Sequence, residues 1–584
     1  MANGKVIVIG GGLAGLMTTV KALEAGLEVE LFAYGPSKRS HSACAQGGLN
    51  AAVNTMGEGD TTWEHFDDSI YGGDFLANQT PVKGMCDTAP DIVYLFDRMG
   101  TMFNRSGEGR IQVRRLGGVK YHRTVFSGAT TGQQLLYTLD EQVRRWEDEG
   151  MVTRYEGWEF LSAVQDDNGV CMGITAQELT SMEIRAFKAD AVVMATGGPG
   201  MMFGETTNST LNTGYAAAQA YMQGVKYANG EFIQIHPTAI PGADKNRLMS
   251  ESARGEGGRV WTYKDGKPWY FLEEWYPAYG NLVPRDVASR AIFKVCVDLG
   301  LGVDGKNMVY LDLSHKDPQE LDNKLGGILE IYEKFGGQDP RKVPMKIFPA
   351  MHYSMGGLWV DFDQMTNIPG LFAAGECEYQ YHGANRLGGN GMLSAIYGGL
   401  SAGKGVVGYV KNQRPSDKPA ALEQEVLKQK EEFKQILQMD GSENPYAIQN
   451  ELGDWMTKNV TVVRYNDRLK KTDEKLQELT ERFKKIKINN HNLWCNQNAV
   501  FIRQLWRRLQ LARVVTLGAL ARDESRGAHY KPEFTERDDE NWLKTTIADY
   551  SPNGPKLSYE EVDIQYIKPR VRKYDVDKEE TMHA

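Results

Sequence analysis

The sequence predicts an α/β protein whose first domain is built around a parallel β-sheet. Residues 5–9 (KVIVI) form a short, apolar, β-branched run, which is typical of a buried parallel strand. Residues 13–26 follow as a helix rich in Leu, Ala and Met, and residues 27–32 (LEVELF) form a second strand. A strand, a helix and a strand in this order indicate a βαβ unit with two parallel strands.

The turn between the first strand and the helix carries a glycine motif. Residues 10–15 (GGGLAG) satisfy the pattern G-x-G-x-x-G, in which missing side chains let a pyrophosphate approach the helix N-terminus. Unpaired N–H groups and the helix dipole favour an anion there. A tight turn without a ligand would show the same pattern, but its place between a strand and a helix predicts a Rossmann-like dinucleotide site. The residues predicted to form it are Gly10, Gly12, Leu13, Ala14 and Gly15.

The second strand lacks the acid that usually binds a ribose hydroxyl at this point. Phe32, Ala33 and Tyr34 occupy its end, and Glu30 lies too early in the alternation. This departure weakens NAD as the resident cofactor, but it does not exclude FAD held by other contacts.

Two later segments repeat the pattern of an apolar run that ends in glycine, namely 191–198 (AVVMATGG) and 370–376 (GLFAAGE). We therefore expect one sheet assembled from distant segments. The Trp- and Tyr-rich stretch between them indicates an inserted α+β domain, and residues 423–437 and 472–487 place apolar residues at helical spacing among many charges. The predicted domains are a discontinuous cofactor-binding domain (1–236 and 350–410), a capping domain (237–349), a helical domain (415–538) and a small C-terminal region with β-like alternation (539–584).

Composition and charge exclude several classes of function. The 584 residues are 41% hydrophobic and 24% charged, and the net charge of -9 argues against a general affinity for nucleic acid. Six cysteines are scattered singly, which excludes a zinc or iron–sulfur site built from paired thiolates. No apolar run approaches the ~20 residues of a membrane span, and a glycine motif starting at Gly10 leaves no room for a cleavable targeting segment. We expect a soluble chain that reaches a membrane only through a partner.

A histidine follows the predicted βαβ unit. Ser40-His41-Ser42, followed by Ala45-Gln46-Gly47-Gly48, resembles the flavin-attachment signature of succinate dehydrogenase and fumarate reductase flavoprotein subunits. The resemblance implies FAD bonded covalently through His41 to its 8α-methyl carbon. A lone histidine is more often a capping or core residue, so the flanking residues carry this prediction. Attachment and nearby charge would make the flavin more oxidising.

The resemblance continues along most of the chain. Ordered matches occur at FIQIHPT (232–238), LMSE and RGEGG (248–251 and 254–258), PRD (284–286), PAMHY (349–353), GE (375–376), HGANRLG (382–388) and SRGAH (525–529). Such an ordered set is far more specific than any one motif. The further FAD contacts that we expect are Lys38, Ser40, Gln46, Gly47, Thr196, Gly197, Glu376, Gly391 and Met392.

The resemblance also implies a C4 dicarboxylate substrate, succinate or fumarate. Each carboxylate needs cations and hydrogen-bond donors in a water-poor site. The implied substrate-binding residues are His236, Ser250, Glu251, His352 and Arg386. A hydride would pass between the substrate and flavin N5, with Arg285 as proton acceptor and Glu251 and Arg254 as the relay. A guanidinium is essentially always protonated, so stabilising developing negative charge is a simpler role for Arg285, and both roles stay open.

Three positions depart from the family pattern. Thr213-Gly214-Tyr215-Ala216 stands where the family shows T-G-D-G, which removes an expected flavin-contacting acid. Asn390-Gly391-Met392-Leu393 replaces N-S-L-L, which removes a serine near the flavin. Ser250 stands where threonine is common and keeps the hydroxyl. The first two departures put individual FAD contacts in doubt and do not touch the dicarboxylate set.

The family resemblance implies partners as well. Electrons must leave the flavin, so we expect an iron–sulfur subunit and a cytochrome b-type membrane anchor that exchanges electrons with quinone, at the cytoplasmic face of the cell membrane. A noncovalent L-aspartate oxidase shares the fold, and His41 counts against it. A soluble fumarate reductase is disfavoured because C-x-x-C-H is absent. A non-catalytic FAD-binding subunit is disfavoured because Arg285 and the carboxylate binders are present. The preferred direction, succinate oxidation or fumarate reduction, stays open.

Overall fold

The computed structural model describes residues 4–242, 245–413 and 419–575. Its central element is a five-stranded sheet whose strands are all parallel. In order across the sheet they are β19 (Leu371–Ala373), β10 (Ala191–Met194), β1 (Lys5–Ile9), β2 (Glu28–Ala33) and β6 (Val152–Glu156). The prediction that one sheet joins distant segments is confirmed; β6 was not predicted.

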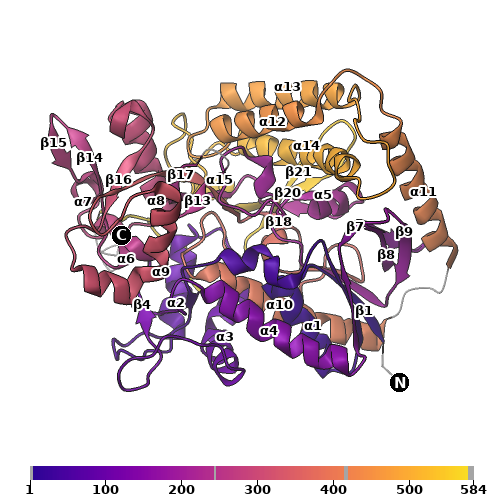
Figure 1. Cartoon of the computed structure of the whole chain (residues 1–584), viewed down its shortest axis with the longest axis horizontal. Coiled ribbons are helices and arrows are strands. Elements are labelled where there is room, and N and C mark those ends of the chain that lie inside the picture. Colours follow the sequence, from indigo (N-terminus) through magenta and orange to yellow (C-terminus); the bar gives the residue numbers. More distant parts are fainter. Residues whose placement is uncertain (1–3, 243–244, 414–418, 576–584) are drawn as a thin grey trace.

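Alternation along β1 creates a separate core on each face of this sheet. Val6 and Val8 point into a core covered by helices, while Ile7 and Ile9 point into a second core. The covering helices are α1 (Leu13–Glu24), α4 (Thr131–Asp148) and α10 (Asn390–Asn412). The other face packs against an antiparallel meander, β7 (Trp158–Gln165), β8 (Cys171–Glu178) and β9 (Ile184–Lys188). Figure 1 shows this meander beside β1 and the three helices below.

A six-stranded sheet forms most of the predicted capping region. Its strands, in order, are β13 (Arg247–Leu248), β12 (Ile233–Ile240), β17 (Met345–Ser354), β16 (Val309–Asp312), β14 (Arg259–Lys264) and β15 (Lys267–Trp269). The accompanying helices are α6 (Ser252–Gly255), α7 (Phe271–Trp275), α8 (Arg285–Phe293) and α9 (Pro318–Gly336). The predicted boundaries at 236 and 350 fall inside β12 and β17, so these two strands connect the cap directly to the cofactor-binding part.

Long helices follow the second part of the cofactor-binding region. They are α11 (Pro419–Leu437), α12 (Pro445–Asn459), α13 (Asn466–Phe483) and α14 (Gln497–Ala521). The helices predicted over 423–437 and 472–487 are thus present, although residues 415–418 of the predicted domain lie outside the described residues. Figure 1 shows α12, α13 and α14 stacked along one side of the molecule. Helix α14 packs against α5 (Tyr215–Met222) and so connects this layer to the central core.

The predicted β-like alternation after residue 538 forms two strands. They are β20 (Lys544–Asp549) and β21 (Lys556–Glu561), which pair with each other and join β11 (Tyr227–Ala228) and β18 (Gly357–Leu358) in one sheet. Residues 576–584 of the predicted C-terminal region lie outside the described residues.

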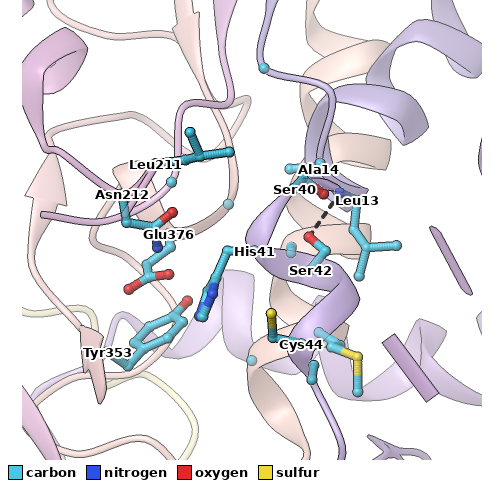
Figure 2. A pocket seen from close by; sticks show the side chains of 18 of the residues that line it. Leu13, Ala14, Ser40, His41, Ser42, Cys44, Leu211, Asn212, Tyr353 and Glu376 are labelled. Atoms are coloured by element: carbon cyan, nitrogen blue, oxygen red, sulfur yellow. Dashed lines mark hydrogen bonds between the residues drawn. The ribbon is translucent and has the colours of Figure 1, made fainter. Parts of the chain in front are cut away.

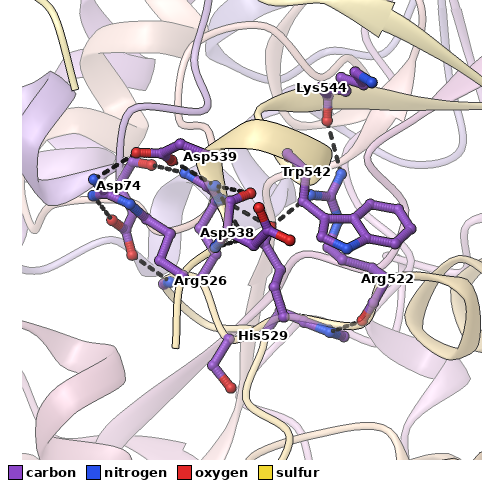
Figure 3. Close-up of polar contacts among 12 residues, drawn as sticks. Asp74, Arg522, Arg526, His529, Asp538, Asp539, Trp542 and Lys544 are labelled. Carbon is purple, nitrogen blue, oxygen red and sulfur yellow. Dashed lines mark hydrogen bonds and ion pairs between the residues drawn. The ribbon is translucent and has the colours of Figure 1, made fainter. Parts of the chain in front are cut away.

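The N-terminal part also contains α2 (Thr62–Gly72), α3 (Gln79–Arg98) and a small sheet of β3 (Leu49–Asn50), β5 (Thr124–Val125) and β4 (Val113–Arg114). Just after α2, Asp74 enters a buried polar network with Arg526 and Arg537 (Figure 3). The SRGAH segment at 525–529 therefore connects the C-terminal part to the N-terminal part of the chain. Within the described ranges, no helix is both long and apolar enough to cross a lipid bilayer.

Candidate functional site

A single cavity begins at the N-terminus of α1, where the strands of the central sheet end, and extends to β12 and β17. The carboxyl ends of parallel strands are the usual place for a ligand site in such sheets. Its wall brings together most of the predicted residues: Gly10, Gly12, Leu13, Ala14, Ser40, His41, Gln46, Gly47, Thr196, Gly197, His236, Ser250, Glu251, Arg285, His352, Glu376, Arg386, Gly391 and Met392. The structure thus places most of the predicted cofactor residues, and all of the predicted substrate-binding residues, around one continuous space.

The glycine motif forms a close-packed cradle at one part of this cavity. A Cβ on Gly11 would overlap the Ser37 side chain, and a Cβ on Gly15 would overlap the Gly10 carbonyl. Gly15 does not line the cavity; it lets α1 pack against the preceding strand. The start of α1 faces the cavity and suits a diphosphate. Buried oxygens of Ser37, Ser40 and Gln46 have no hydrogen-bond partner within the described part of the chain, so the cradle fits a large polar ligand.

His41 projects from a 3₁₀ turn, η2 (His41–Cys44), into this cavity. Figure 2 shows its ring directed toward Tyr353 and Glu376 and away from the start of α1. Its Nδ1 accepts a hydrogen bond from the Ser209 N–H at 3.2 Å, so Nε2 is the nitrogen available to a ligand. Burial, with added repulsion from Lys245 and Arg386, lowers the pKa of His41 to about 4. The imidazole is therefore neutral at pH 7. Because Nδ1 accepts a hydrogen bond, the ring proton lies on Nε2, and a bond formed at Nε2 would have to release that proton.

Lys38 differs from its predicted role. Lys38 does not line the cavity. Its ammonium pairs with Glu141 at 3.3 Å and Asp140 at 3.6 Å on α4, and it lies over the Tyr137 ring. The carboxylates of α4 attract this cation away from the cavity, which accounts for the difference from a phosphate contact.

Arg285, the first residue of α8, is held by three hydrogen bonds. Its Nε and Nη2 donate to Glu251 Oε2 at 3.0 and 2.8 Å, and Nη1 donates to Gln234 Oε1 at 2.9 Å. The other Glu251 oxygen accepts from Arg254 Nη2 at 2.9 Å, and Arg254 lies behind the cavity wall. Burial raises the pKa of Glu251, but Arg285 and Arg254 outweigh burial and hold it below its usual value. An ionised carboxylate therefore joins two buried guanidinium groups.

Two histidines lie beside this chain of charges. His236 on β12 and His352 on β17 have ring centroids 4.8 Å apart. Burial lowers the pKa of both well below the usual value, with Arg285 as the next contribution, so both rings are neutral. His352 Nδ1 bonds to Thr207 Oγ1 at 2.7 Å, while His236 Nε2 is buried and has no partner among the described residues. A substrate could satisfy this nitrogen.

Arg386 is a second buried cation in the wall of the cavity, in addition to Arg285. Its guanidinium carbon lies 4.2 Å from the centre of the Tyr353 ring, which holds the planar group in one orientation. Burial lowers the pKa of Arg386 to about 10, with repulsion from Arg285 adding to it, so the group stays protonated at pH 7. Its Nε is buried and has no partner within the described ranges. Arg386 is therefore a buried cation ready to bind a carboxylate.

An adjoining cavity shares Gly10 and Tyr34 with the first and extends toward the meander. Its wall is largely aromatic and includes Phe32, Trp158, Phe160 and Tyr215. Tyr215 occupies the position where an acid was expected. The carboxylate of this wall is instead Glu159, which pairs with Arg503 and accepts from Gln504 Nε2 at 2.7 Å. Because both partners lie on α14, the helical layer reaches this end of the site.

Among the residues that the sequence interpretation did not assign to the site, three contact its predicted side chains: Gln234, Thr207 and Tyr353. Gln234 lies two residues before His236 on β12, and residues i and i+2 of a strand share a face. That period of two could have identified it. The contact of Thr207 with His352 and of Tyr353 with Arg386 join segments far apart in the chain, and no local pattern indicates them.

Comparisons with known proteins agree with this geometry. Residues 5–392 match the family model described as an FAD binding domain, and residues 449–574 match the fumarate reductase flavoprotein C-terminal model. The succinate dehydrogenase flavoprotein subunit of Bacillus subtilis (strain 168) is 66% identical over 583 residues, which cover 99% of this chain and 100% of that protein. The chain belongs to the succinate dehydrogenase and fumarate reductase flavoprotein subunits.

Other members of this flavoprotein family are more distant in sequence but close in structure. The fumarate reductase flavoprotein subunit of Escherichia coli (strain K12) is 33% identical, covering 97% of this chain and 95% of its own. A chain of E. coli quinol fumarate reductase superposes with a TM-score of 0.93 at 32% identity, covering 98% of this chain and 99% of that one. Mycobacterium smegmatis Sdh1 in complex with UQ1 gives a TM-score of 0.83 at 30% identity, covering 96% and 94%. The protein is thus a flavoprotein of an oxidoreductase family, and FAD is its cofactor.

Proposed function

We propose that this flavoprotein subunit interconverts succinate and fumarate within a succinate:quinone oxidoreductase. The observation that carries the proposal is the position of Arg386, His236 and His352 beside Arg285, at the end of the cofactor cavity. A dicarboxylate dianion needs a buried cation and several donors at each end. These residues, with the Ser250 hydroxyl, supply them in one wall.

The fit of the cavity to FAD supports an extended binding mode. The diphosphate would lie at the start of α1, and the isoalloxazine would lie between His41 and the substrate residues. The adenosine would then enter the adjoining aromatic cavity, where the Glu159 carboxylate can accept its hydrogen-bond donors. When bound, FAD would supply a hydride acceptor for succinate oxidation or a hydride donor for fumarate reduction.

The chain's own residues would bind and orient the substrate. Arg386 would hold one carboxylate bidentately, because Tyr353 fixes the plane of the guanidinium. The neutral His236 and His352 rings would donate or accept hydrogen bonds without adding charge. Closely packed groups around them exclude water and so strengthen each of these electrostatic contacts.

Arg285 would transfer a proton to or from the substrate. The proton would be exchanged at the carbon next to the one that exchanges the hydride. The three hydrogen bonds of Arg285 hold the guanidinium toward the cavity, and Glu251 connects it to Arg254. This continuous chain supports a relay in which Glu251 passes the proton between the two arginines. The same fixed positive charge would stabilise negative charge that develops on the substrate, so the two roles are compatible.

We further propose that His41 Nε2 bonds covalently to the flavin 8α-methyl carbon. The Nε2–H and one methyl C–H bond would break, both protons would leave, and the electron pair would reduce the flavin and pass to the same acceptor that serves turnover. Acid precipitation tests this directly, because covalent flavin stays in the washed pellet. We expect flavin in the pellet of the parent protein and in the supernatant for His41→Ser. His122→Ser is the matched control, since His122 is partly exposed, pairs with Glu58 and does not line the cavity. Flavin in the supernatant of a parent protein that oxidises succinate would contradict the attachment.

Partners follow from the electron balance. In the described residues, no group of three or more His, Cys, Asp or Glu side chains could hold a metal ion, and no helix could span a membrane. Two related structures are a quinol-fumarate reductase with menaquinol molecules and Mycobacterium smegmatis Sdh1 in complex with UQ1. We propose that an iron–sulfur subunit and a cytochrome b-type anchor connect this chain to quinone at the cytoplasmic face of the membrane.

A dye-reduction assay tests the substrate. The purified protein should reduce an artificial electron acceptor with succinate and not with L-aspartate. Arg386→Gln should lose this activity, because the neutral amide cannot replace the buried cation. Reduction with L-aspartate in place of succinate would assign the chain to an aspartate oxidase reaction instead.

A further inference from the structure

The last described residues, 570–575, form a segment that we call the C-terminal strap. It runs past α2 and ends beside α8. Tyr71 on α2 fixes its path, because the Tyr71 hydroxyl donates to the Lys573 carbonyl and accepts from the Lys573 N–H, each at 2.8 Å. The strap is thus bound to the N-terminal part of the fold by specific hydrogen bonds.

Arg572 of the strap contacts both α2, in the N-terminal part of the fold, and α8, the helix that carries Arg285. Its Nη1 and Nη2 donate to the two oxygens of Asp286 at 2.7 and 3.1 Å. Nη2 also donates to the Gly72 carbonyl at 3.1 Å, and Nη1 lies 3.7 Å from Asp74 Oδ2. Asp286 follows Arg285 directly in the chain, so Arg572 fixes the residue adjacent to the proposed proton-transfer group.

Tyr574 of the strap packs against the turn that precedes α8. Its ring packs edge-on against Tyr71 and Tyr279, with centroids 5.7 and 5.0 Å apart. Tyr279 begins the turn that contains Asn281, whose carbonyl accepts from Arg254 Nη1 at 2.7 Å. The strap therefore contacts the side chains of Asp286, next to Arg285, and of Tyr279, in the turn that binds Arg254.

The Asp286 carboxylate depends on Arg572 for its charge balance. Its side chain is fully buried, and Arg290 is its more distant partner at 3.4 Å. Arg290 also donates to the Gly527 carbonyl at 2.6 Å, so it is only partly available to Asp286. Removing Arg572 would leave this buried carboxylate with the distant Arg290 and the Val287 N–H as partners at the start of α8.

We propose that Arg572 is a positioning residue: the strap clamps residues 279–293 against α2 and so holds Arg285 where it serves the substrate. The proposal rests on the function proposed for Arg285. Errors of about 1 Å in the position of a reacting group lower turnover on the order of 100-fold. The contact of Arg572 with Asp286 is therefore a condition for a complete site.

The test compares two arginines of the same strap in the FAD-loaded, assembled enzyme. Arg572→Met removes the clamp, while Arg570→Met is the matched control, because Arg570 pairs bidentately with Asp67 on α2 at 2.8–2.9 Å and does not reach α8. We expect Arg572→Met to lower kcat about 10–100-fold with little change in KM. Arg570→Met should keep the parent turnover. Arg572→Lys should recover part of the loss, because it restores one charged contact to Asp286.

Hydrogen exchange provides a readout that does not depend on catalysis. Peptides covering residues 279–293 should exchange faster in Arg572→Met than in Arg570→Met. The proposal would be overturned if Arg572→Met had the same turnover as the parent and the same hydrogen-exchange rates over residues 279–293. Arg285→Lys is measured in parallel: an active Arg285→Lys would contradict the proposed role of Arg285, whereas an inactive Arg285→Lys beside a fully active Arg572→Met would reject the strap alone.

A double variant separates positioning from folding. Asp286→Asn combined with Arg572→Met removes both buried charges, so it should fold even if Arg572→Met does not. A slow double variant with the parent's thermal stability supports positioning. Parent turnover in the double variant would show that Arg572 only balances a charge, which overturns the proposal.

Discussion

Arg285→Lys is the most informative single substitution in the proposed site. The guanidinium makes two hydrogen bonds to Glu251 and one to Gln234, all between 2.8 and 3.0 Å. A lysine ammonium keeps the charge, but it can reproduce about one of these contacts. Each charge-assisted hydrogen bond contributes about 1.5–3 kcal/mol, so the loss of two is worth roughly 3–6 kcal/mol. If that loss falls on the transition state, kcat decreases about 10²–10⁴-fold.

The assay is succinate-dependent dye reduction, with FAD content measured in the same sample. KM should change little, because Arg386 and the two histidines still bind the substrate. Arg259→Lys is the matched control: Arg259 also makes a bidentate pair, with Glu273 at 2.7 and 2.8 Å, outside the cavity wall. A kcat for Arg285→Lys within about tenfold of the parent would refute the reasoning, since it lies below the expected range.

Three further predictions concern the cavity wall. Gly117→Ala places a methyl group 2.6 Å from the carboxylate that joins the two arginines, so kcat should fall while FAD content is kept. Tyr353→Leu removes the ring that holds Arg386, and KM for succinate should rise about 5–30-fold, as expected for a loss of about 1–2 kcal/mol. Burial raises the pKa of Glu376 from its ordinary value of 4.5 to about 7. Between these two pH values the Glu376 side chain is protonated in the folded protein and ionised in the unfolded chain. Stability of the His41→Ser protein, after its noncovalent FAD has been removed, should therefore fall as pH rises from about 4.5 to 7, by at most about 1.4 kcal/mol per pH unit. Glu376→Gln should flatten that slope in thermal unfolding.

Local sequence patterns predicted the elements that local physics determines. The apolar runs, the glycine motif and the helices over 423–437 and 472–487 all appear in the structure, because strand and helix periodicity follow from which faces are buried. The joining of 191–198 and 370–376 into one sheet was also predictable, since both runs end in glycine as the first strand does.

Contacts between distant segments could not be predicted in the same way. Lys38 was expected at the phosphates, but the carboxylates of α4 hold it elsewhere, and only the packing of α4 reveals this. The pairing of Glu159 with Arg503 joins β7 to α14 across more than 300 residues. The strap contact of Arg572 with Asp286 is of the same kind. An isolated arginine near acids usually indicates a surface pair, and burial is what distinguishes these pairs from that default.

The most direct test of the central claim is an anaerobic titration of the FAD-loaded protein, followed by visible flavin absorbance. Succinate should bleach the flavin, fumarate should restore its absorbance after reduction, and L-aspartate should have no effect. These results would show that the site exchanges a hydride with a C4 dicarboxylate. Flavin that L-aspartate bleaches and succinate does not would contradict the account.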